Sequence, residues 1–204
     1  MPPLNRFDSI APIYDGLASL AFGQSIKKAQ RAHLGDVPAR SDVLVLGGGT
    51  GKWLGELLGQ DAGCRVWYVE ASLKMIHLAK KNLKGNGRVV FIHGTHLDIP
   101  DRKFDVVITH FFVDLFTGPD LEKLSGKVAT VLKKNGKWIV ADFVNRKYWH
   151  GAMLWLMYLF FHAIGALDHK GLPEWDGIIQ RKSFVKENTM VFYKGFIESV
   201  LYSH

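Results

Sequence analysis

The feature that most constrains this chain is a run of glycines placed directly after a hydrophobic stretch. Residues 42–47 (DVLVLG) are apolar and rich in β-branched side chains, which is typical of a strand buried on both faces. The glycines of 47–51 (GGGTG) follow at once, and 52–59 (KWLGELLG) then has a helical pattern. A strand, a glycine turn and a helix in this order bring backbone N–H groups and the positive end of the helix dipole close to an anionic ligand. We therefore expect a binding site at this turn.

The glycine spacing argues against two common phosphate-binding turns. A P-loop requires G-x-x-x-x-G-K-[ST], but counting from Gly51 places Leu46 at its first position and Trp53 where the magnesium-binding hydroxyl belongs. The dinucleotide fingerprint G-x-G-x-x-G requires a third glycine at a position that Lys52 or Leu54 occupies. What remains is G-x-G-x-G, and a nicotinamide oxidoreductase is disfavoured for that reason.

An acidic residue ends the next predicted strand. The pattern of residues 64–70 (CRVWYVE) predicts a strand, and Glu70 lies about twenty residues after the glycines. A carboxylate at this point is suited to accept hydrogen bonds from the two hydroxyls of a ribose. A ligand that combines a carboxylate with an adenosine ribose is S-adenosylmethionine (SAM).

Strands and helices alternate along most of the chain. Such a series predicts a parallel α/β sheet with right-handed crossovers, and without repeats or linkers it predicts one domain. Near the end, residues 189–203 predict an antiparallel hairpin around a tight turn at Lys194 and Gly195. Further strands are expected at 88–94, 104–111 and 137–144, and further helices at 72–85, with Ser72 as the N-cap, and at 119–136.

These segments resemble the class I SAM-dependent methyltransferases over about residues 5–145. VLVLGGGTG resembles the first motif of that family, VEASLKMIHLAKKNL the second, and FDVVITHFFVDLF the strand and loop that meet the substrate. VLKKNGKWIVADF is similar to the start of a later strand, and RFDSIAPIYDGLASLAFG resembles the ubiquinone/menaquinone C-methyltransferase branch. The resemblance implies an α/β fold with a Rossmann-like, doubly wound seven-stranded sheet, mostly parallel with an antiparallel C-terminal hairpin. The single domain would comprise an N-terminal helical cap (1–38), a cofactor-binding core (39–145), an apolar helical lid (146–182) and a closing hairpin (183–204).

The resemblance also implies a cofactor and the residues that hold it. The cofactor is SAM, with S-adenosylhomocysteine (SAH) as its product. Two acids common in the family are replaced, by Val45 before the glycines and by Thr95 after the third strand, which leaves a catalytically weakened SAM-fold binding or scaffold protein as an alternative. The predicted cofactor-binding residues are Tyr14, Gly47, Gly48, Gly49, Thr50, Gly51, Glu70, Ala71, Met75, Thr95, His96, Leu97 and Thr109.

The acceptor side is expected at the carboxyl end of the fourth strand. His110 and Asp114 follow there and are the predicted catalytic residues, because an imidazole or a carboxylate could remove a proton from the acceptor. The alternative for His110 is that it lines the adenine or caps a helix. Asp142, at the end of the fifth strand, could also face the acceptor.

Composition narrows the acceptor and the location. The formal net charge of +7 keeps an RNA methyltransferase as an alternative, although no basic arm or appended RNA-binding segment is visible. Residues 148–167 contain no formal charge, but two histidines and several small residues argue against a membrane span and favour a lid over a hydrophobic pocket. We expect a small, lipophilic acceptor, a monomer or homodimer, and peripheral membrane contact as another use of these aromatic residues. The single cysteine, Cys64, and the lack of a secretory signal favour the cytoplasm, and no metal site is predicted.

Overall fold

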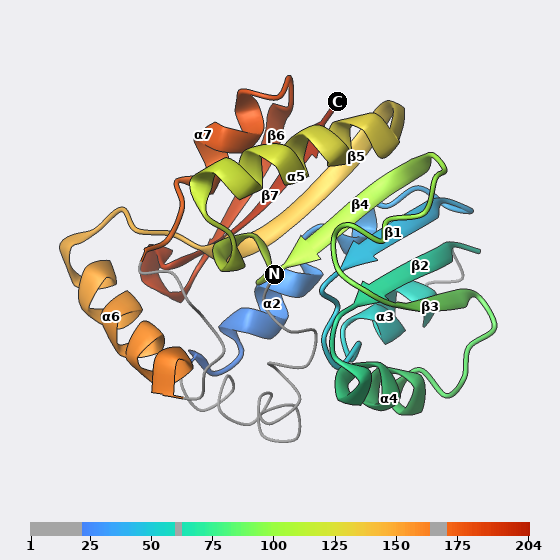
Figure 1. Cartoon of the computed structure of the whole chain (residues 1–204), viewed down its shortest axis with the longest axis horizontal. Helices are drawn as coiled ribbons and strands as arrows, with labels where there is room; N and C mark the ends of the chain where they lie inside the picture. Colours follow the sequence, from blue (N-terminus) through green and yellow to red (C-terminus); the bar gives the residue numbers. More distant parts are fainter. Residues whose placement is uncertain (1–21, 60–62, 164–170) are drawn as a thin grey trace.

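The computed structural model describes residues 22–59, 63–163 and 171–204, with the side chains of 158–163 outside that description. Tyr14 and most of the expected helical cap therefore lie outside the described residues. Within these ranges, seven strands form one sheet in the order β3-β2-β1-β4-β5-β7-β6 (Figure 1). The strands are β1 (Asp42–Leu46), β2 (Arg65–Glu70), β3 (Val89–His93), β4 (Phe104–His110), β5 (Leu132–Phe143), β6 (Val185–Phe192) and β7 (Ile197–Ser203).

The sheet is mixed, with its antiparallel pairs at one end. β1 pairs in parallel with β2 and β4, β2 with β3, and β4 with β5, whereas β7 runs antiparallel to both β5 and β6. This arrangement confirms the predicted fold class, including the C-terminal hairpin. The helices of the described ranges are α2 (Ser25–Arg31), α3 (Leu54–Gly59), α4 (Leu73–Asn82), α5 (Gly118–Val131), α6 (Tyr148–Ala163) and α7 (Trp175–Gln180).

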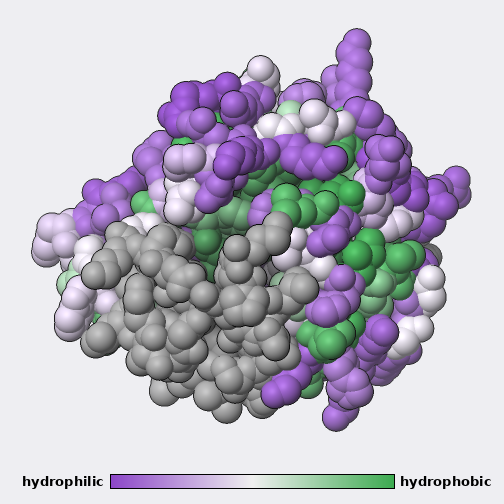
Figure 2. Space-filling model, viewed as in Figure 1, coloured by the Kyte–Doolittle hydropathy of each residue, from purple (hydrophilic) through white to green (hydrophobic). Residues whose placement is uncertain are grey.

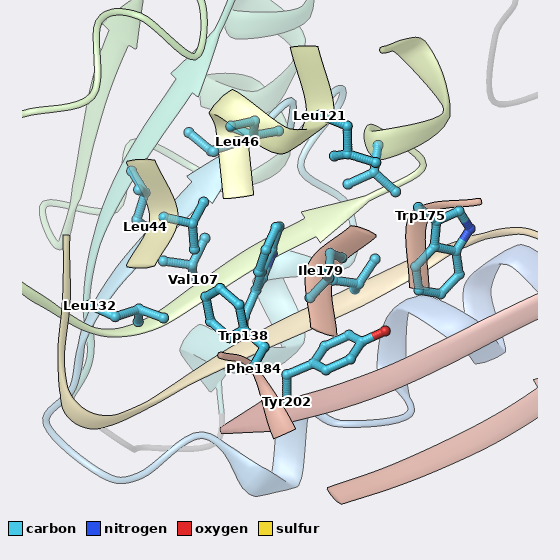
Figure 3. Packing of buried hydrophobic residues seen from close by; sticks show 14 of the residues in the cluster. Leu44, Leu46, Val107, Leu121, Leu132, Trp138, Trp175, Ile179, Phe184 and Tyr202 are labelled. Atoms are coloured by element: carbon cyan, nitrogen blue, oxygen red, sulfur yellow. The ribbon is translucent and has the colours of Figure 1, made fainter. Parts of the chain in front are cut away.

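Helices cover both faces of the sheet, because the central strands alternate their side chains between the faces. In β1, Val43 and Val45 face an apolar cluster shared with α3 and α4. Leu44 and Leu46 face the opposite cluster, which α5 and α7 complete (Figure 3). β1 is buried along its whole length, which explains why its sequence is a nearly continuous apolar run.

Several predicted boundaries differ from the observed ones, among them the start of the strand expected at 137–144, which begins at Leu132. The helix expected over 119–136 ends at Val131, because Leu132 already has extended backbone angles (φ −73°, ψ 145°) and pairs with Phe104 of β4. The hairpin turn lies where it was predicted, with φ of 55° at Lys194 and 95° at Gly195. However, β6 begins at Val185, before the predicted start of that hairpin.

A third apolar cluster lies at the C-terminal end of β5. It joins Phe143 of β5 and Phe196, just before β7, to Leu154 of α6 and to Phe22 and Ala29 at α2. The chain runs from the end of β5 into α6, which lies at the periphery of the molecule (Figure 1). Within the described residues, no helix combines the length and hydrophobicity that crossing a bilayer requires.

Candidate active site

The glycine turn connects the end of β1 to the start of α3. Gly47, Gly49 and Gly51 have φ of 64°, 64° and 66°, a left-handed conformation that other residues adopt only with strain. A Cβ atom added to Gly49 would meet no atom within 4 Å. The turn therefore has a shape that glycine permits, and its backbone at Gly49 is open to a ligand.

Aromatic rings pack against the same turn. A Cβ on Gly48 would lie 2.3 Å from the ring of Tyr68, and a Cβ on Gly47 would lie 2.3 Å from the ring of Phe112. The hydroxyl of Tyr68 also donates to the carbonyl oxygen of Gly49 at 2.8 Å. These glycines are thus needed for packing as well as for conformation. Sequence reasoning missed both rings, although strand alternation places Tyr68 on the same face of β2 as Glu70.

Glu70 ties the glycine turn to the start of α4. Its carboxylate is buried: Oε2 accepts the N–H of Gly49 at 3.0 Å, and Oε1 accepts the N–H of Ser72 at 2.9 Å. Ser72 caps α4 as predicted, because its hydroxyl accepts the N–H of Met75 at 3.1 Å. The Glu70 carboxylate thus connects the end of β2 to both the glycine turn and α4.

The loop after β3 contains an acidic residue, Asp98, that hydrogen-bonds within the loop. Asp98 Oδ2 accepts both the N–H of Thr95, at 2.8 Å, and its hydroxyl, at 3.2 Å. The N–H of Leu97 donates to Thr95 Oγ1 at 3.2 Å, and the Leu97 side chain is exposed together with Leu73 at the start of α4. Figure 2 shows hydrophobic surface on this side of the molecule. The loop therefore places a carboxylate next to exposed apolar side chains.

His96 and His93 flank this loop. The His96 ring packs edge-on against Phe116 at 4.9 Å, and its partial burial lowers its pKa although Asp120 and Asp98 act in the opposite direction. His93 Nε2 lies 3.0 Å from the carbonyl oxygen of Ala71 and must donate to it. Ala71, next to Glu70, is thus linked by His93 to the end of β3, and the loop that contains Thr95 and His96 follows there.

His110 is enclosed on the α3 side of the sheet. Its ring packs edge-on against Trp53, with centroids 4.5 Å apart, and its side chain is buried. Within the described residues, neither ring nitrogen of His110 has a hydrogen-bond partner, nor does the buried indole nitrogen of Trp53. Burial, with a smaller effect of His33, lowers the pKa of His110 to about 3. The imidazole is therefore neutral at ordinary pH and keeps hydrogen-bonding capacity that the described residues do not use.

Asp114 lies beside Asp142 of β5 in a different environment. Asp142 is fully buried, and its Oδ2 accepts the N–H groups of Phe112 (3.0 Å), Val113 (2.9 Å) and Asp114 (3.3 Å). These bonds hold the turn after β4, in which Phe111 has a strained φ of 52°. The carboxylate of Asp142 is therefore used by this turn, and a role of Asp142 toward the acceptor stays a prediction.

The pKa values of both Asp114 and Asp142 are raised. Burial raises the pKa of Asp142 to about 7, with its backbone hydrogen bonds acting in the opposite direction. Burial and the neighbouring Asp142 hold the pKa of Asp114 well above its usual range. Two carboxyl groups so close do not both ionise readily, so the pair retains a proton nearer to neutral pH than an exposed carboxylate does.

Three other predicted residues are buried. Met75 is buried, and the carbonyl of Thr50 accepts from the side-chain amide of Asn82 at 2.8 Å. The Thr109 hydroxyl is buried and accepts the indole N–H of Trp138 at 2.9 Å. Among the described residues, no group of three or more His, Cys, Asp or Glu side chains is placed to hold a metal ion.

A glycine turn after β1, an acid at the end of β2 and the observed strand order occur together here. Residues 43–136 match the family model of a methyltransferase domain. An uncharacterized methyltransferase of Anoxybacillus flavithermus is 34% identical over 109 residues, an alignment that covers 52% of this chain and 49% of the relative. The match thus spans about half the length of that curated relative.

Solved structures share the fold over most of the chain. A chain of the complex between the Haloferax volcanii Trm112 methyltransferase activator and a methyltransferase has a TM-score of 0.76 at 16% identity, covering 97% of this chain and 95% of its own. The N-methyltransferase NodS of Bradyrhizobium japonicum, in complex with SAH, has a TM-score of 0.64 at 11% identity and covers 88% and 85%. At these identities the likeness concerns the fold alone. Together with the matched segment, it supports a methyltransferase.

Proposed function

We propose that this protein transfers the methyl group of SAM to a small, hydrophobic acceptor. The observation that carries the proposal is the turn of three left-handed glycines, with open space beside Gly49. The N–H of Gly49 also donates a hydrogen bond to the buried carboxylate of Glu70. The turn suits a carboxylate ligand and Glu70 suits a ribose, so these residues fit SAM. Asp98, Thr95 and Leu97 would face its base.

Bound SAM supplies an electrophilic methyl group on a sulfonium. The chain mainly contributes position, since holding donor and acceptor in line supplies on the order of 7–11 kcal/mol of the barrier reduction. Phe111, Phe112 and Phe143 surround the end of β4 and would exclude water from the acceptor. The left-handed Phe111 is held in place by the bonds that Asp142 accepts from the following residues.

Asp114 is the better proton acceptor of the two predicted catalytic residues. Because burial and Asp142 raise its pKa, the ionised Asp114 is a stronger base than an ordinary carboxylate, whereas a His110 with a pKa of about 3 is a weak base. His110 would instead hydrogen-bond the acceptor or a water as a neutral imidazole, beside Trp53. The pH dependence of turnover with an acceptor that must lose a proton would separate the two roles.

The acceptor class is inferred from apolar surroundings. The third cluster places phenylalanine, methionine and tryptophan side chains of β5 and α6 next to the end of β4. The resemblance of residues 6–23 to the quinone-methylating branch also favours a quinone-like ring, a phenol or a lipid precursor. Neither observation identifies the atom that is methylated.

Calorimetric titration with SAH, with NADH as a control, tests the cofactor. We expect SAH to bind and NADH not to bind. Gly49→Asn should remove SAH binding, because asparagine tolerates a left-handed backbone but fills the open space. Gly85→Asn is the matched control: Gly85 has φ of 63°, also with no atom within 4 Å, and follows the end of α4. Equal SAH affinity of both variants would contradict the assignment of the glycine turn.

The two alternatives give different results in the same preparation. SAH binding without turnover on any phenol, quinone or lipid precursor would favour the scaffold interpretation. Salt-dependent retention of RNA, with methyl transfer to it, would favour an RNA methyltransferase.

A further inference from the structure

The outward face of α6 is apolar. We define the outer face of α6 as Tyr148, Gly151, Ala152, Trp155 and Leu156, which recur at helical spacing and are all exposed. The exposed fractions are 97% for Tyr148, 66% for Trp155 and 57% for Leu156. None of the 16 residues of α6 is charged. A surface helix of a globular protein normally presents charged or polar side chains at such positions.

The opposite face of α6 is already used. Leu154 is buried in the third cluster with Phe143 and Phe196, and Trp149 and Met153 pack against the same cluster. The N-terminus of the helix is also fixed, since His150 Nδ1 accepts the backbone N–H of Arg146 at 3.1 Å. The outer face therefore cannot be buried by rotation of the helix without loss of this packing.

We propose that the outer face of α6 docks on the surface of an anionic lipid bilayer. Tyrosine and tryptophan are the residues enriched at membrane–water interfaces, because each combines an apolar ring with a polar group. The face combines one of each with a leucine and two small residues that let the helix approach the surface closely. The contact that we propose is interfacial, with the rings at the level of the lipid headgroups.

Two lysines that lie close to the N-terminal end of α6 are suited to anionic lipid. Lys147 precedes α6, and its Nζ donates to the carbonyl oxygen of Lys194 at 2.8 Å, which places two exposed lysines side by side. In the part of the chain that the structure describes, neither ammonium group forms an ion pair with a carboxylate. Arg146, in contrast, lies against Asp176 and Glu198 at 3.3 and 2.9 Å, which offset its charge. Lysines next to an apolar face strengthen binding to anionic lipid.

The described part of the outer face of α6 is smaller than the surface that each partner of a stable protein–protein interface buries. Aromatic side chains have on the order of 150–250 Å² each, so two aromatics and a leucine expose about 400–500 Å². A stable protein–protein interface buries about 800 Å² on each partner. A membrane surface has no such minimum, because lysine attraction and ring insertion add to the same contact.

Docking of α6 does not rest on the proposed reaction, but α6 packs on residues close to the proposed acceptor site. The cluster under α6 includes Phe111 at the end of β4, next to the predicted catalytic residues. A docked α6 would therefore bring the acceptor side of the site close to the lipid surface, where a lipophilic acceptor partitions.

Flotation with lipid vesicles tests the proposal on the full chain without cofactor. We expect the protein to float with phosphatidylcholine vesicles that contain phosphatidylglycerol, and less with phosphatidylcholine alone. The double variant Trp155→Gln/Leu156→Gln should bind at least about tenfold more weakly. Lys147→Gln should lower binding to the anionic vesicles alone, by about fivefold.

The control removes equally exposed apolar side chains elsewhere. Val185 and Val191 on the edge strand β6 are 65% and 57% exposed, and Val185→Gln/Val191→Gln should bind vesicles like the wild type. A wild type that does not float with either vesicle overturns the proposal, as does unchanged flotation of Trp155→Gln/Leu156→Gln. If sedimentation shows a dimer that this variant abolishes, without lipid binding, the face belongs to a second copy instead. These outcomes are separate from SAH binding, so failure of docking leaves the cofactor assignment standing.

Discussion

Glu70 holds the glycine turn and the start of α4 by hydrogen bonds, and we propose that it also binds the ribose of SAM. Replacing Glu70 with glutamine tests both roles. In the wild type, one carboxylate oxygen accepts from Gly49 and the other accepts from Ser72. A glutamine side chain has one oxygen and one NH₂ group. Whichever way it turns, either the half-buried N–H of Gly49 or the buried N–H of Ser72 faces a donor.

The expected effect of Glu70→Gln follows from that mismatch. Loss of one hydrogen bond to a charged acceptor costs about 1.5–3 kcal/mol, including the unmet donor. For a chain of this length that corresponds to a Tm lower by about 3–12 °C. Replacing one carboxylate oxygen with an NH₂ group should also reduce the rise in Tm that SAH causes in the wild type, because we propose that the ribose donates to this carboxylate and the rise depends on affinity.

Ser72→Ala is the matched comparison at the same junction. It removes the hydroxyl that accepts from Met75 and caps α4, at a cost of about 1 kcal/mol. It leaves Glu70 in place, so its Tm should fall while the rise caused by SAH stays as in the wild type. Thermal unfolding of the three proteins with and without SAH gives both quantities.

Two results would refute this reasoning. An unchanged free energy of unfolding in Glu70→Gln would mean that the two backbone bonds contribute nothing to stability. A loss of the SAH effect in Ser72→Ala as large as in Glu70→Gln would mean that the position of α4, and not the Glu70 carboxylate, determines nucleoside binding.

Three further predictions concern the stability effects of Gly48, Asp114 and His110. Gly48→Ala should lower the free energy of unfolding by about 1–3 kcal/mol in denaturant titrations, because its methyl group overlaps the Tyr68 ring; a neutral effect would mean that the ring moves aside. Because the pKa of Asp114 is raised on folding, its contribution to stability is present at acidic pH and is lost as the pH rises. Asp114→Asn should therefore match the wild type in stability near pH 4 and exceed it near pH 8, and parallel pH profiles of unfolding would contradict this. The pKa of His110 is lowered to about 3, so its contribution is present above pH 6.5 and is lost as the pH falls; His110→Phe should lose less stability between pH 6.5 and 4, as acid unfolding curves would show.

Part of the site follows from local sequence, for a physical reason. The strand at 42–46 is apolar because both of its faces are buried, and the three left-handed glycines directly follow it. Glu70 reaches Gly49 because parallel pairing places the ends of β1 and β2 side by side. Short-range pattern and the rules of parallel sheets were therefore sufficient for the fold class, the glycine turn and the place of Glu70 at the end of β2.

Other contacts required the tertiary structure, because they join segments whose relation no local pattern encodes. Asp142 of β5 accepts from three residues of the turn after β4, although its position at a strand end suggested an open acceptor site. The burial of His110 against Trp53 likewise depends on how α3 packs on β4.

The helix α6 gives the clearest division between the two sources of information. Its sequence determined that it is apolar and helical, but a helix that is apolar all round has no periodicity to mark its buried side. Only the packing of Leu154 under the third cluster decided that Tyr148, Trp155 and Leu156 face outward. Burial is a property of the assembled chain, so the sequence specified the composition of this surface and the tertiary structure specified its direction.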